Sequence, residues 1–425
     1  MYSIKNHVLH VEEVSTAQLA ETYGTPLYIY SEAKLMEQLD EIRASFLDAY
    51  DDTHAAFACK AFSTKYMCRL LEKEGFWLDV VSGGELYTAM SANFPAHRIE
   101  FNGNNKSIEE LTMALEYGVG RIVIDDVSEI ELLESLCKHH DKKVKVLFRI
   151  TPGVSAATHD YISTGKKDSK FGIPLNEEVL YPAIERAILS SELEFLGFHF
   201  HVGSQLCEAD THQAALEVAL ALILETQKRF NYVVPDLNIG GGFGIRYTNQ
   251  DHPLHLSAFV KPIMDRITDF CEKHHIKRPH ISMEPGRYIV GEAGLQLYTI
   301  GNIKTIPEIK TYVSIDGGMT DNMRPGLYGA KYDAVVANKA DLPKTFKVDI
   351  SGKCCESTDI LIKNIEIATP ERGDLLAVFS TGAYGYSMAN NYNKLTIPAV
   401  VIVKGDQHQL IVKRQTYADI VSREL

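Results

Sequence analysis

The chain has 425 residues, 45% of them hydrophobic and 23% charged, as in ordinary globular proteins and unlike fibres or disordered chains. This length accommodates one large domain and a second, smaller one. The formal net charge of −13 argues against binding to nucleic acid or to an anionic membrane, because both need basic surfaces.

The sequence indicates a cytoplasmic protein. Residues 1–10 carry one lysine and no apolar core, so no secretory signal is expected there. The most apolar stretch, Leu216–Leu224, is interrupted by Glu217 and is too short to span a bilayer, so it predicts a buried helix. The seven cysteines are scattered without a CxxC pair, which is typical of free thiols in a reducing cytosol, and the adjacent Cys354 and Cys355 suit thiols better than a mutual disulfide.

In chain order, the first predicted strand is Leu27–Tyr30, within an N-terminal segment (residues 1–30) that we expect to join a β domain. Eight further β-rich runs alternate with helical patterns: Ala55–Lys60, Trp77–Val81, Arg98–Asn102, Arg121–Asp125, Lys145–Ile150, Phe195–His201, Asp236–Gly240 and His280–Glu284. Ser107 and Ser128 each precede a glutamate by three residues, a pattern that predicts a helix beginning with a capping box. This alternation predicts a (β/α)8 TIM barrel over residues 31–284, with a doubly wound α/β sheet as the alternative.

After Glu284 the pattern changes to short strands with turn residues and few long helical periods between them. The predicted strands are Leu295–Lys304, Thr311–Ile315, Lys347–Ile350, Leu375–Val378 and Ala399–Val403. Residues 285–425 are therefore predicted to form a mostly β C-terminal domain.

Polar residues lie at the ends of the predicted barrel strands, where barrel enzymes place their active sites. In strand order they are Lys60, Asp79 and Ser82, Asn102, Arg149, His201, the glycines Gly240, Gly241 and Gly242, and the run Glu284-Pro-Gly-Arg287. Successive glycines let a backbone approach an anion, and the loops after the last two strands of such barrels often hold a phosphate. We therefore expect a phosphate site here, to which Arg287 adds charge; a plain tight turn is the alternative for the glycine run.

Lys60 ends the apolar run Ala55–Cys59, so we expect a buried lysine at the mouth of the barrel. Loss of hydration would favour its neutral amine, which is a nucleophile for carbonyl carbons. The alternative is a structural ion pair with Asp79 or Glu284.

His199 and His201 occupy alternate positions of one predicted strand, so they would point to the same side, as metal-binding pairs do. A zinc or iron site would need further histidines or aspartates at other strand ends. Those ends offer lysine, arginine and glycine instead, so no metal site is predicted.

Motifs that extend over nearly the whole chain resemble those of one enzyme family. They are Phe57-Ala-Cys-Lys60-Ala-Phe62, Leu78-Asp-Val-Val-Ser-Gly-Gly-Glu85-Leu86, Tyr161-Ile-Ser-Thr-Gly165, Ser169-Lys-Phe-Gly172, His199-Phe-His201-Val-Gly-Ser204-Gln205, Asn238-Ile-Gly-Gly-Gly-Phe-Gly244, Glu284-Pro-Gly-Arg287, Asp316-Gly-Gly-Met319, Arg324-Pro-Gly-Leu-Tyr328, Cys355-Glu-Ser-Thr-Asp359 and Gly382-Ala-Tyr384-Gly385. In this order and spacing the chain resembles diaminopimelate decarboxylase, within the alanine-racemase-like (fold-type III) pyridoxal-phosphate enzymes that include eukaryotic ornithine decarboxylase.

The resemblance implies a pyridoxal-phosphate barrel, a C-terminal β domain and a homodimer whose two active sites each take residues from the partner. Lys60 would bind the cofactor covalently, His201 would stack on its ring, and Glu284 would pair with its pyridine nitrogen. The other cofactor-binding residues would be Asp79, Ser204, Gly241, Gly242, Arg287 and Tyr384, of which Ser204, Gly242, Arg287 and Tyr384 would hold the phosphate end. The substrate would be bound by Arg287, Arg324, Tyr328, Glu356 and Tyr384, with Cys355 of the neighbouring subunit as the acid.

Two positions depart from the common pattern of this family. Phe62 stands where many members have asparagine, and Lys353-Cys354 stands where a proline and an aliphatic residue are commoner. Neither position has an implied catalytic role, but Phe62 lies close to the cofactor lysine in sequence and bears on fine specificity.

The residue types also bear on the reaction and the substrate. Loss of CO2 from an amino acid leaves electrons on the α-carbon, and a protonated pyridine ring accepts them when a carboxylate such as Glu284 keeps it protonated. Diaminopimelate carries a second carboxylate and ammonium, which Arg324 and Glu356 would bind. We therefore expect decarboxylation of meso-diaminopimelate to lysine, in lysine biosynthesis. The alternatives are a relative acting on another basic amino acid, carboxynorspermidine or a siderophore intermediate, an inactive cofactor-binding homologue, and a metal-dependent barrel hydrolase.

Overall fold

The computed structural model describes residues 1–154 and 169–425. The described chain forms two compact units. The barrel unit consists of Asp40–Gly244 and Pro253–Gly286, and the β unit consists of Met1–Leu39, Ile245–His252 and Arg287–Leu425. The Tyr161–Gly165 motif lies outside the described residues.

The barrel unit contains a closed barrel of eight parallel strands, in which each strand pairs with its neighbours in sequence and the last pairs with the first. The strands are β5 (Thr53–Ala58), β6 (Trp77–Val80), β7 (Ile99–Phe101), β8 (Arg121–Ile124), β9 (Val144–Arg149), β10 (Leu193–His199), β11 (Asp236–Asn238) and β12 (His280–Met283). The predicted (β/α)8 barrel is confirmed, and closure excludes the doubly wound sheet.

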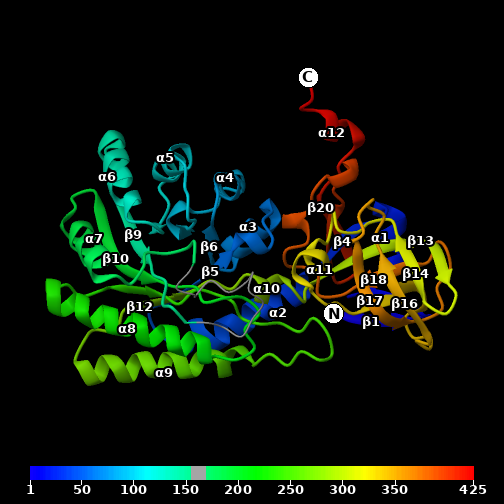
Figure 1. Cartoon of the computed structure of the whole chain (residues 1–425), viewed down its shortest axis with the longest axis horizontal. Coiled ribbons are helices and arrows are strands. Elements are labelled where there is room, and N and C mark those ends of the chain that lie inside the picture. Colours follow the sequence, from blue (N-terminus) through cyan, green and yellow to red (C-terminus); the bar gives the residue numbers. More distant parts are fainter. Residues whose placement is uncertain (155–168) are drawn as a thin grey trace. The chain divides into compact units, whose positions relative to one another are not determined.

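Helices follow the strands and cover the barrel. They are α3 (Lys65–Lys73), α4 (Gly83–Ser91), α5 (Ile108–Tyr117), α6 (Ser128–His140), α7 (Glu177–Leu189), α8 (Asp210–Phe230) and α9 (Leu256–His274), and α2 (Glu32–Ile42) precedes β5. Helices α8 and α9 run side by side (Figure 1). The predicted buried helix at Leu216–Leu224 is confirmed as the middle of α8, where Leu216, Leu220 and Ile223 are buried at helical spacing.

Every barrel strand ends one or two residues before its predicted end. Strand β5 ends at Ala58 rather than Lys60, and β10 ends at His199 rather than His201. The last register pair between β10 and β11 joins His199 to Asn238, and beyond it both chains enter loops. Of the polar residues predicted at the strand ends, Lys60, Asn102, His201 and Glu284 therefore lie just beyond the strands, whereas Asp79 and Arg149 remain within β6 and β9.

The two predicted capping boxes have different outcomes. At α5, Ser107 accepts a hydrogen bond from the Glu110 amide and the Glu110 carboxylate accepts one from the Ser107 amide, so this capping box is confirmed. The prediction for Ser128 is wrong, because Ser128 is already the first residue of α6. Asp126 accepts hydrogen bonds from both the amide and the hydroxyl of Ser128, which takes the place of the predicted cap.

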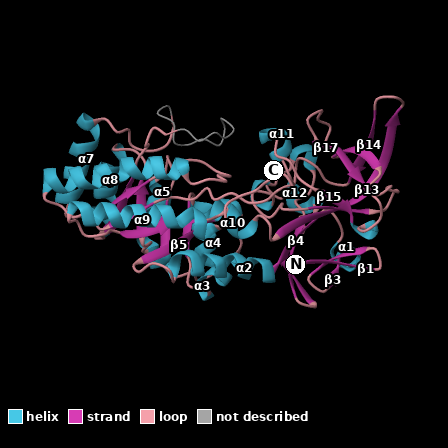
Figure 2. Ribbon diagram, turned by 90° about the horizontal axis from the view of Figure 1, so that it is seen from below, coloured by secondary structure: helices cyan, strands magenta, loops and turns pink. Residues whose placement is uncertain are grey.

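The β unit consists mainly of strands. They are β1 (Tyr2–Lys5), β2 (Val8–Val11), β3 (Val14–Ser15), β4 (Leu27–Ser31), β13 (Gly294–Ile306), β14 (Lys310–Ile315), β15 (Ala334–Val336), β16 (Phe346–Ser351), β17 (Ile360–Ile367), β18 (Leu375–Val378), β19 (Ala399–Lys404) and β20 (Gln407–Val412). Its helices are α1 (Thr16–Tyr23), α10 (Arg287–Val290), α11 (Arg324–Tyr328) and α12 (Tyr417–Val421). Strands β13 and β14 form a long antiparallel ribbon (Figure 2). The predicted mostly β domain is confirmed, although β15, β17 and β20 were not among the predicted strands.

Strand β4 is the central strand of the main sheet in the β unit. It pairs with β13 in antiparallel and with β19 in parallel orientation, and all five of its residues are buried. Its side chains Leu27 and Ile29 pack in an apolar core with Leu295 and Leu297 of β13. The start of the chain is therefore bound to strands far away in the sequence.

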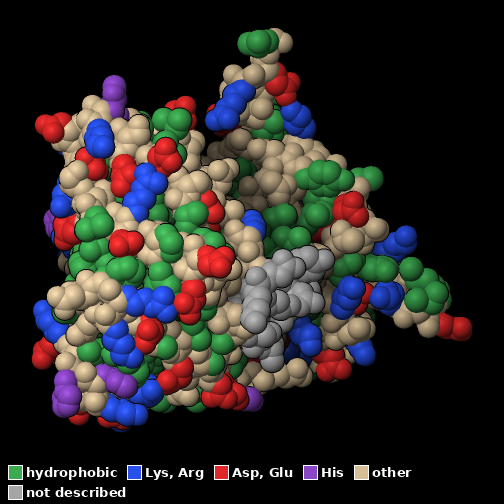
Figure 3. Space-filling view, turned by 60° about the vertical axis from the view of Figure 1, so that its left-hand side comes forward, with side chains coloured by type: hydrophobic (Ala, Val, Ile, Leu, Met, Phe, Trp, Pro, Cys, Tyr) green, Lys and Arg blue, Asp and Glu red, His purple; other side chains and the backbone are tan. Residues whose placement is uncertain are grey.

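The described surface has no strongly basic region on the face shown in Figure 3, where acidic and basic side chains are interspersed. No helix among residues 1–154 and 169–425 combines the length and apolarity that crossing a membrane requires. All seven cysteines are free thiols, including the adjacent Cys354 and Cys355.

The two helix starts provide a test of the capping argument. We expect Ser107→Ala to destabilise the protein by about 1 kcal/mol, because the Glu110 amide at the start of α5 loses its side-chain acceptor. This corresponds to a decrease in melting temperature of about 2–4 °C by calorimetry. Ser128→Ala is the matched control and should cost less than about 0.5 kcal/mol, since Asp126 still accepts from the helix. Equal losses in the two variants would contradict this account.

Candidate active site

The C-terminal end of the barrel holds a buried carboxylate, Glu284, which directly follows β12. Its Oε1 lies 2.9 Å from Nε2 of His199. The same oxygen accepts hydrogen bonds from the side-chain amides of Asn238 at 2.9 Å and Asn102 at 3.2 Å. Asn102 also donates to Asp79 at 2.6 Å. Five barrel strands, β6, β7, β10, β11 and β12, thus end in one group of polar side chains in contact with one another.

The two carboxyl groups of this cluster are in opposite ionisation states. Burial alone would raise the pKa of Glu284, but His199, Lys60 and Arg149 outweigh it and lower the pKa to about 2. Burial, followed by the negative charge of Glu284, raises the pKa of Asp79 well above its usual range. Of these two neighbouring carboxyl groups, Glu284 is therefore held ionised, whereas the surroundings of Asp79 favour its protonated form.

His201 follows β10 and lies half-buried at the mouth of the barrel. Its Nδ1 accepts a hydrogen bond from the Gly241 amide at 3.3 Å, so the proton of the neutral ring is on Nε2. Burial, with further contributions from Lys60 and Arg149, lowers the pKa of His201 well below its usual value. The side chain therefore presents a neutral aromatic ring. His199 and His201 do not form a metal pair, because His199 lies against Glu284 instead.

Lys60 lies in a short 3-10 turn, Cys59–Ala61, directly after β5. The sequence predicted a buried lysine, and this is wrong: Cys59 and Ala61 are buried, whereas Lys60 is exposed. The turn, closed by a hydrogen bond from the Phe62 amide to the Cys59 carbonyl, directs the side chain away from the packed face. Its charge nevertheless acts on Asp79 and Glu284, which places the amine on the same side of the barrel as the carboxyl cluster.

The glycine run after β11 packs directly against neighbouring backbone. A Cβ at Gly241 would lie 2.0 Å from the Glu284 carbonyl oxygen, and one at Gly242 would lie 2.2 Å from that of Gly203. Gly242 also has φ +103°, which side chains disfavour. The run therefore joins the loops after β10 and β12 at close range. Ser204 lies half-buried in the first of these loops.

The β unit contains a cluster of two buried arginines and three tyrosines. The Tyr247 hydroxyl accepts hydrogen bonds from both Arg287 and, at 3.0 Å, Arg324. The guanidinium of Arg287 lies over the Tyr384 ring, 4.8 Å from its centroid, and Arg324 also donates to the Tyr332 hydroxyl at 2.5 Å. No carboxylate among the described residues forms an ion pair with Arg324 at 4 Å or less. Two buried positive charges held by neutral hydroxyls and rings favour binding of an anion.

Arg324 is the first residue of α11, with Pro325 at the next position, where proline favours a helix start. Burial alone would lower the pKa of Arg324, but the tyrosine hydroxyls raise it, so the charge is retained. The last residue of this helix, Tyr328, is half-buried. Both ends of this motif therefore lie in a short helix.

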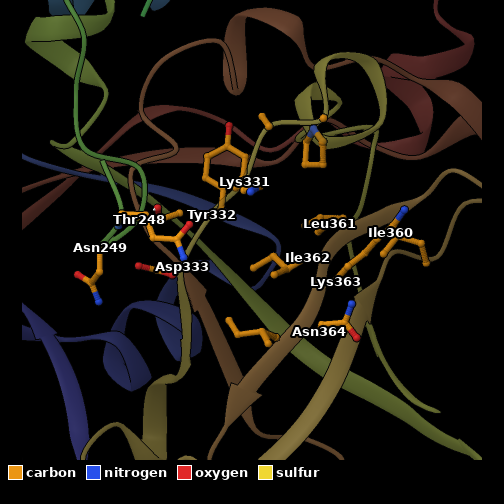
Figure 4. Close-up of a pocket in the computed structure, with 15 residues that line it drawn as sticks. Thr248, Asn249, Lys331, Tyr332, Asp333, Ile360, Leu361, Ile362, Lys363 and Asn364 are labelled. Carbon is orange, nitrogen blue, oxygen red and sulfur yellow. Dashed lines mark hydrogen bonds between the residues drawn. The ribbon is translucent and has the colours of Figure 1, made fainter. Parts of the chain in front are cut away.

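A cavity of about 540 Å³ lies beside this helix in the β unit (Figure 4). One side is formed by Lys331, Tyr332 and Asp333, and the other by β17. Tyr332 therefore borders the cavity and also accepts the hydrogen bond from Arg324. Burial raises the pKa of Tyr332 to about 12, so this acceptor is a neutral phenol.

Cys355 and Glu356 lie on an exposed loop of the β unit. The loop is held by the buried Asp359, whose carboxylate accepts hydrogen bonds from the Cys354 amide at 2.9 Å and the Met319 amide at 2.7 Å. The Cys355 amide donates to Asn393 at 2.7 Å. The backbone of this loop is therefore fixed while its thiol and carboxylate project outward.

Several residues of both clusters were not predicted as site residues. In the barrel unit they are His199 and Asn238, and in the β unit they are Tyr247 and Tyr332. Asn102, by contrast, was among the polar residues predicted at the strand ends. A signal for the first group exists in the sequence: Asn238 and Asp236 on β11, like Glu100 and Asn102 at β7, place polar residues at alternate positions of otherwise apolar strands.

Comparison with known proteins identifies the family. Residues 33–291 match the model of the pyridoxal-dependent decarboxylase, pyridoxal binding domain. The chain is 49% identical to the diaminopimelate decarboxylase of Bacillus subtilis, over 98% of this chain and 95% of the relative. It is 47% identical to that of Bacillus methanolicus, over 97% and 95%. A crystal structure of diaminopimelate decarboxylase from M. jannaschii in complex with L-lysine superposes with a TM-score of 0.93, at 34% identity, over 100% of this chain and 98% of that one.

The chain belongs to the diaminopimelate decarboxylase family. The barrel residues fit the pyridoxal phosphate of this family on the observations above. Glu284 is ionised, as a partner of a protonated pyridine nitrogen must be, and His201 presents a neutral ring suited to stacking. Lys60 supplies an amine on the same side of the barrel as these groups.

The ionised state of Glu284 is open to a direct test. We expect Glu284→Gln to retain the cofactor but to slow decarboxylation by about 10²–10³, because an amide cannot stabilise a protonated ring nitrogen. Absorbance would measure the bound cofactor, and CO2 release would measure turnover. Asp79→Asn is the matched control: Asp79 is already neutral, so its amide should cost far less. A Glu284→Gln enzyme with near-normal turnover would contradict the assignment.

Proposed function

We propose that the chain catalyses the pyridoxal-phosphate-dependent decarboxylation of meso-2,6-diaminopimelate to L-lysine and CO2, a step in lysine biosynthesis. The observation that carries this proposal is the buried, ionised Glu284 at the C-terminal end of a closed barrel. It is the charge that a pyridine-based electron sink requires, in a chain whose relatives at 49% and 47% identity are diaminopimelate decarboxylases.

When bound, pyridoxal phosphate supplies a sink for the electrons that CO2 leaves behind. In this proposal Lys60 holds the cofactor covalently through its Nζ, and His201 supports one face of the ring. Glu284 keeps a proton at the ring nitrogen, with Asn102 and Asn238 fixing its carboxylate by hydrogen bonds. Racemases of this broad class place an arginine where Glu284 stands, which weakens the sink, so glutamate favours decarboxylation.

The phosphate end is proposed to be held by Ser204, Gly241, Gly242, Arg287 and Tyr384, with Asp79 completing the cofactor site. The glycines allow close backbone approach, and Arg287 provides a buried positive charge. Asp79 is protonated and acts as a neutral hydrogen-bonding group next to Glu284.

The substrate is proposed to be held at its far end by charge. Arg324 would bind the distal carboxylate, since a guanidinium can bind a carboxylate through two parallel hydrogen bonds. Glu356 would bind the distal ammonium, with Tyr328 and Tyr384 beside them. The hydrogen bond from the Thr358 amide is the main cause of the lowered pKa of Glu356, so this exposed group is an anion at neutral pH.

We further propose that the active unit is a homodimer in which Cys355 and Glu356 serve the site of the partner subunit. Both residues project from a rigid, exposed loop of the β unit, as a contribution to another chain requires. Residues 31–284 would form the cofactor-binding domain, with residues 285–425 and the N-terminal segment 1–30 completing the substrate site. Free cysteines throughout the chain support a cytoplasmic location.

Substrate choice tests the role of Arg324. We expect the wild type to release CO2 from meso-diaminopimelate but poorly from lysine, which lacks the distal carboxylate. Arg324→Ala should raise KM for diaminopimelate by about tenfold to a hundredfold, because a charge-assisted hydrogen bond is lost. Arg324→Lys, which keeps the charge without the planar fork, should be intermediate. An unchanged ratio of kcat/KM for the two substrates would refute this role.

Subunit mixing tests the shared site. Lys60→Ala and Cys355→Ala should each be inactive alone. Mixed and allowed to exchange subunits, they should recover about a quarter of wild-type activity, because random heterodimers each contain one intact site. The control mixes Lys60→Ala with the double variant Lys60→Ala/Cys355→Ala, which should recover nothing. Absence of recovery in confirmed heterodimers would show that each site lies within one chain.

A further inference from the structure

The interior of the barrel contains a second group of ionisable side chains, at a layer below Glu284. The group consists of His54, Glu100, Arg121, Asp236 and His280, from β5, β7, β8, β11 and β12, together with Asp52, which precedes β5 and lies next to His280. Trp77 of β6 stacks on His54. Glu100 is fully buried, and His54, Arg121 and Asp236 are buried. Barrel interiors are ordinarily filled by branched apolar side chains, so this polar layer needs a physical reason.

Four side chains of this group form a continuous chain of short contacts. Asp52, before β5, lies 2.7 Å from Nδ1 of His280. Nε2 of His280 lies 2.5 Å from Nδ1 of His54, and Nε2 of His54 lies 2.7 Å from Oε1 of Glu100. The Asp52 side chain is 62% exposed and that of His280 22% exposed, so the chain leads from the buried Glu100 to solvent.

Asn238 connects Glu100 to Glu284. Its side-chain nitrogen donates to Oε2 of Glu100 and to Oε1 of Glu284, each at 2.9 Å. Its oxygen accepts from the Gly240 amide at 2.8 Å, so the orientation of the amide is fixed. Each amide proton therefore serves one of the two carboxyl groups, and a change of charge at Glu100 alters the partner of Glu284.

The contacts allow two arrangements of protons. In the first, Glu100 is protonated and donates to Nε2 of His54, whose Nδ1 donates to Nε2 of a neutral His280. In the second, the Glu100 O–H bond has broken and an Nε2–H bond has formed on His54, while the Nδ1–H bond of His54 has broken and an Nε2–H bond has formed on His280. The net change is one proton moved from Glu100 to His280, whose Nδ1–H donates to Asp52 in both arrangements.

We propose that Glu100 is a positioning residue for Glu284, acting through Asn238, and that it exchanges its proton with solvent through His54 and His280. The inference rests on the proposed function, since it concerns the carboxylate that would pair with the cofactor ring. His54 stays neutral in both arrangements, in accord with its pKa, which burial, and then Arg121, lower well below the usual value.

Glu100 is poised to titrate near neutral pH. Burial raises its pKa to about 7, against the opposing charge of Arg121, whose Nη1 lies 3.6 Å away. The charged or titratable groups that face it from the surrounding strands are His54, Asp79, Arg121, His199, Asp236, His280 and Glu284. Glu100 is protonated below this pKa and ionised above it, so the negative charge behind Glu284 grows as pH rises through about 7.

A purely structural role explains this layer poorly. Buried ion pairs seldom stabilise a fold more than apolar residues of similar volume, because removing charges from water is costly. Arg121 already has a direct partner in Asp236 at 2.8 Å, which accounts for that pair without Glu100. Stability does not explain why Glu100 contacts Glu284 through Asn238 on one side and solvent through His54 and His280 on the other.

The variant Glu100→Gln tests the proposal, because it preserves the shape of the side chain and removes its titration. In the apoprotein, the infrared difference spectrum between the wild type and Glu100→Gln should contain a protonated carboxyl band that disappears as pH rises through about 7. Bands of Asp79 and Asp321, whose pKa values burial also raises, occur in both proteins and cancel in this difference. Apoprotein of the Glu100→Gln variant, titrated with pyridoxal phosphate, should have the same Kd as the wild type at about pH 6 and a Kd about tenfold weaker at about pH 8. A tenfold change in Kd corresponds to a change of one unit in the pKa of the ring nitrogen.

Two further variants complete the test. His212→Phe removes a buried histidine that lies among aromatic rings of the same barrel, and its Kd should follow the wild-type pH dependence. His280→Phe should move the pH step upward, since the charge of His280 lowers the pKa of Glu100. It also serves if Glu100→Gln does not fold, because His280 lies near the surface.

Three outcomes decide between the possibilities. A Glu100→Gln protein whose Kd changes by the same factor at both pH values would overturn the coupling to Glu284. A difference spectrum without a protonated carboxyl band that titrates near pH 7 would overturn the assignment of the proton to Glu100. The infrared measurement needs neither cofactor nor substrate, so a wild type that releases no CO2 from diaminopimelate would contradict the proposed function alone and leave the Glu100 result standing.

Discussion

The hydrogen-bonded environment of Glu284 is the constraint on which the rest of the barrel chemistry depends. A carboxylate inside a protein is ordinarily driven towards protonation, because burial penalises the charged form. Here His199 at 2.9 Å and the amides of Asn102 and Asn238 oppose that penalty. Asp79 is only one amide away and takes the neutral form instead. One negative charge is thus fixed at one position, as a cofactor ring with a protonated nitrogen needs.

The β unit holds buried positive charges, where the barrel unit holds a buried negative charge. Arg287 and Arg324 are buried positive charges whose described contacts are hydroxyls and aromatic rings, with Tyr247 shared between them. Such contacts hold the guanidinium groups in place, and no carboxylate in the described part of the chain forms an ion pair with Arg324 within 4 Å, so an anionic ligand can still gain from its charge. The same unit fixes the Cys355–Glu356 loop through the buried Asp359 rather than through the reactive side chains themselves. In each case a residue that is not itself reactive provides the rigidity.

The sequence predicted the architecture well because the barrel repeats a local pattern. The alternation of strands and helices, the capping box at Ser107 and the many turns of the C-terminal part each depend on short stretches of sequence, so they could be predicted. Details that depend on a few competing contacts were not predicted: Lys60 is exposed in the turn after β5, and Asp126, not Ser128, accepts the hydrogen bonds at the start of α6. The contacts of Glu284 were beyond prediction, since His199 and Asn102 come from strands far from it in the chain, and only closure of the barrel brings them together.

The barrel interior contains polar side chains at positions where apolar ones would stabilise the fold at least as well. Glu100 and Asn102 share one face of β7, and Asp236 and Asn238 share one face of β11, so the alternation that normally places apolar side chains inside places polar ones there. Each such residue must find a partner within the barrel, and each partner must in turn be polar. Because Glu284 is ionised, it needs a hydrogen-bond donor, and the side-chain amide of Asn238 supplies one. The second proton of that amide then needs an acceptor deeper in the barrel. A carboxyl group at Glu100 provides that acceptor, and the histidines beneath it follow from the need to balance its charge.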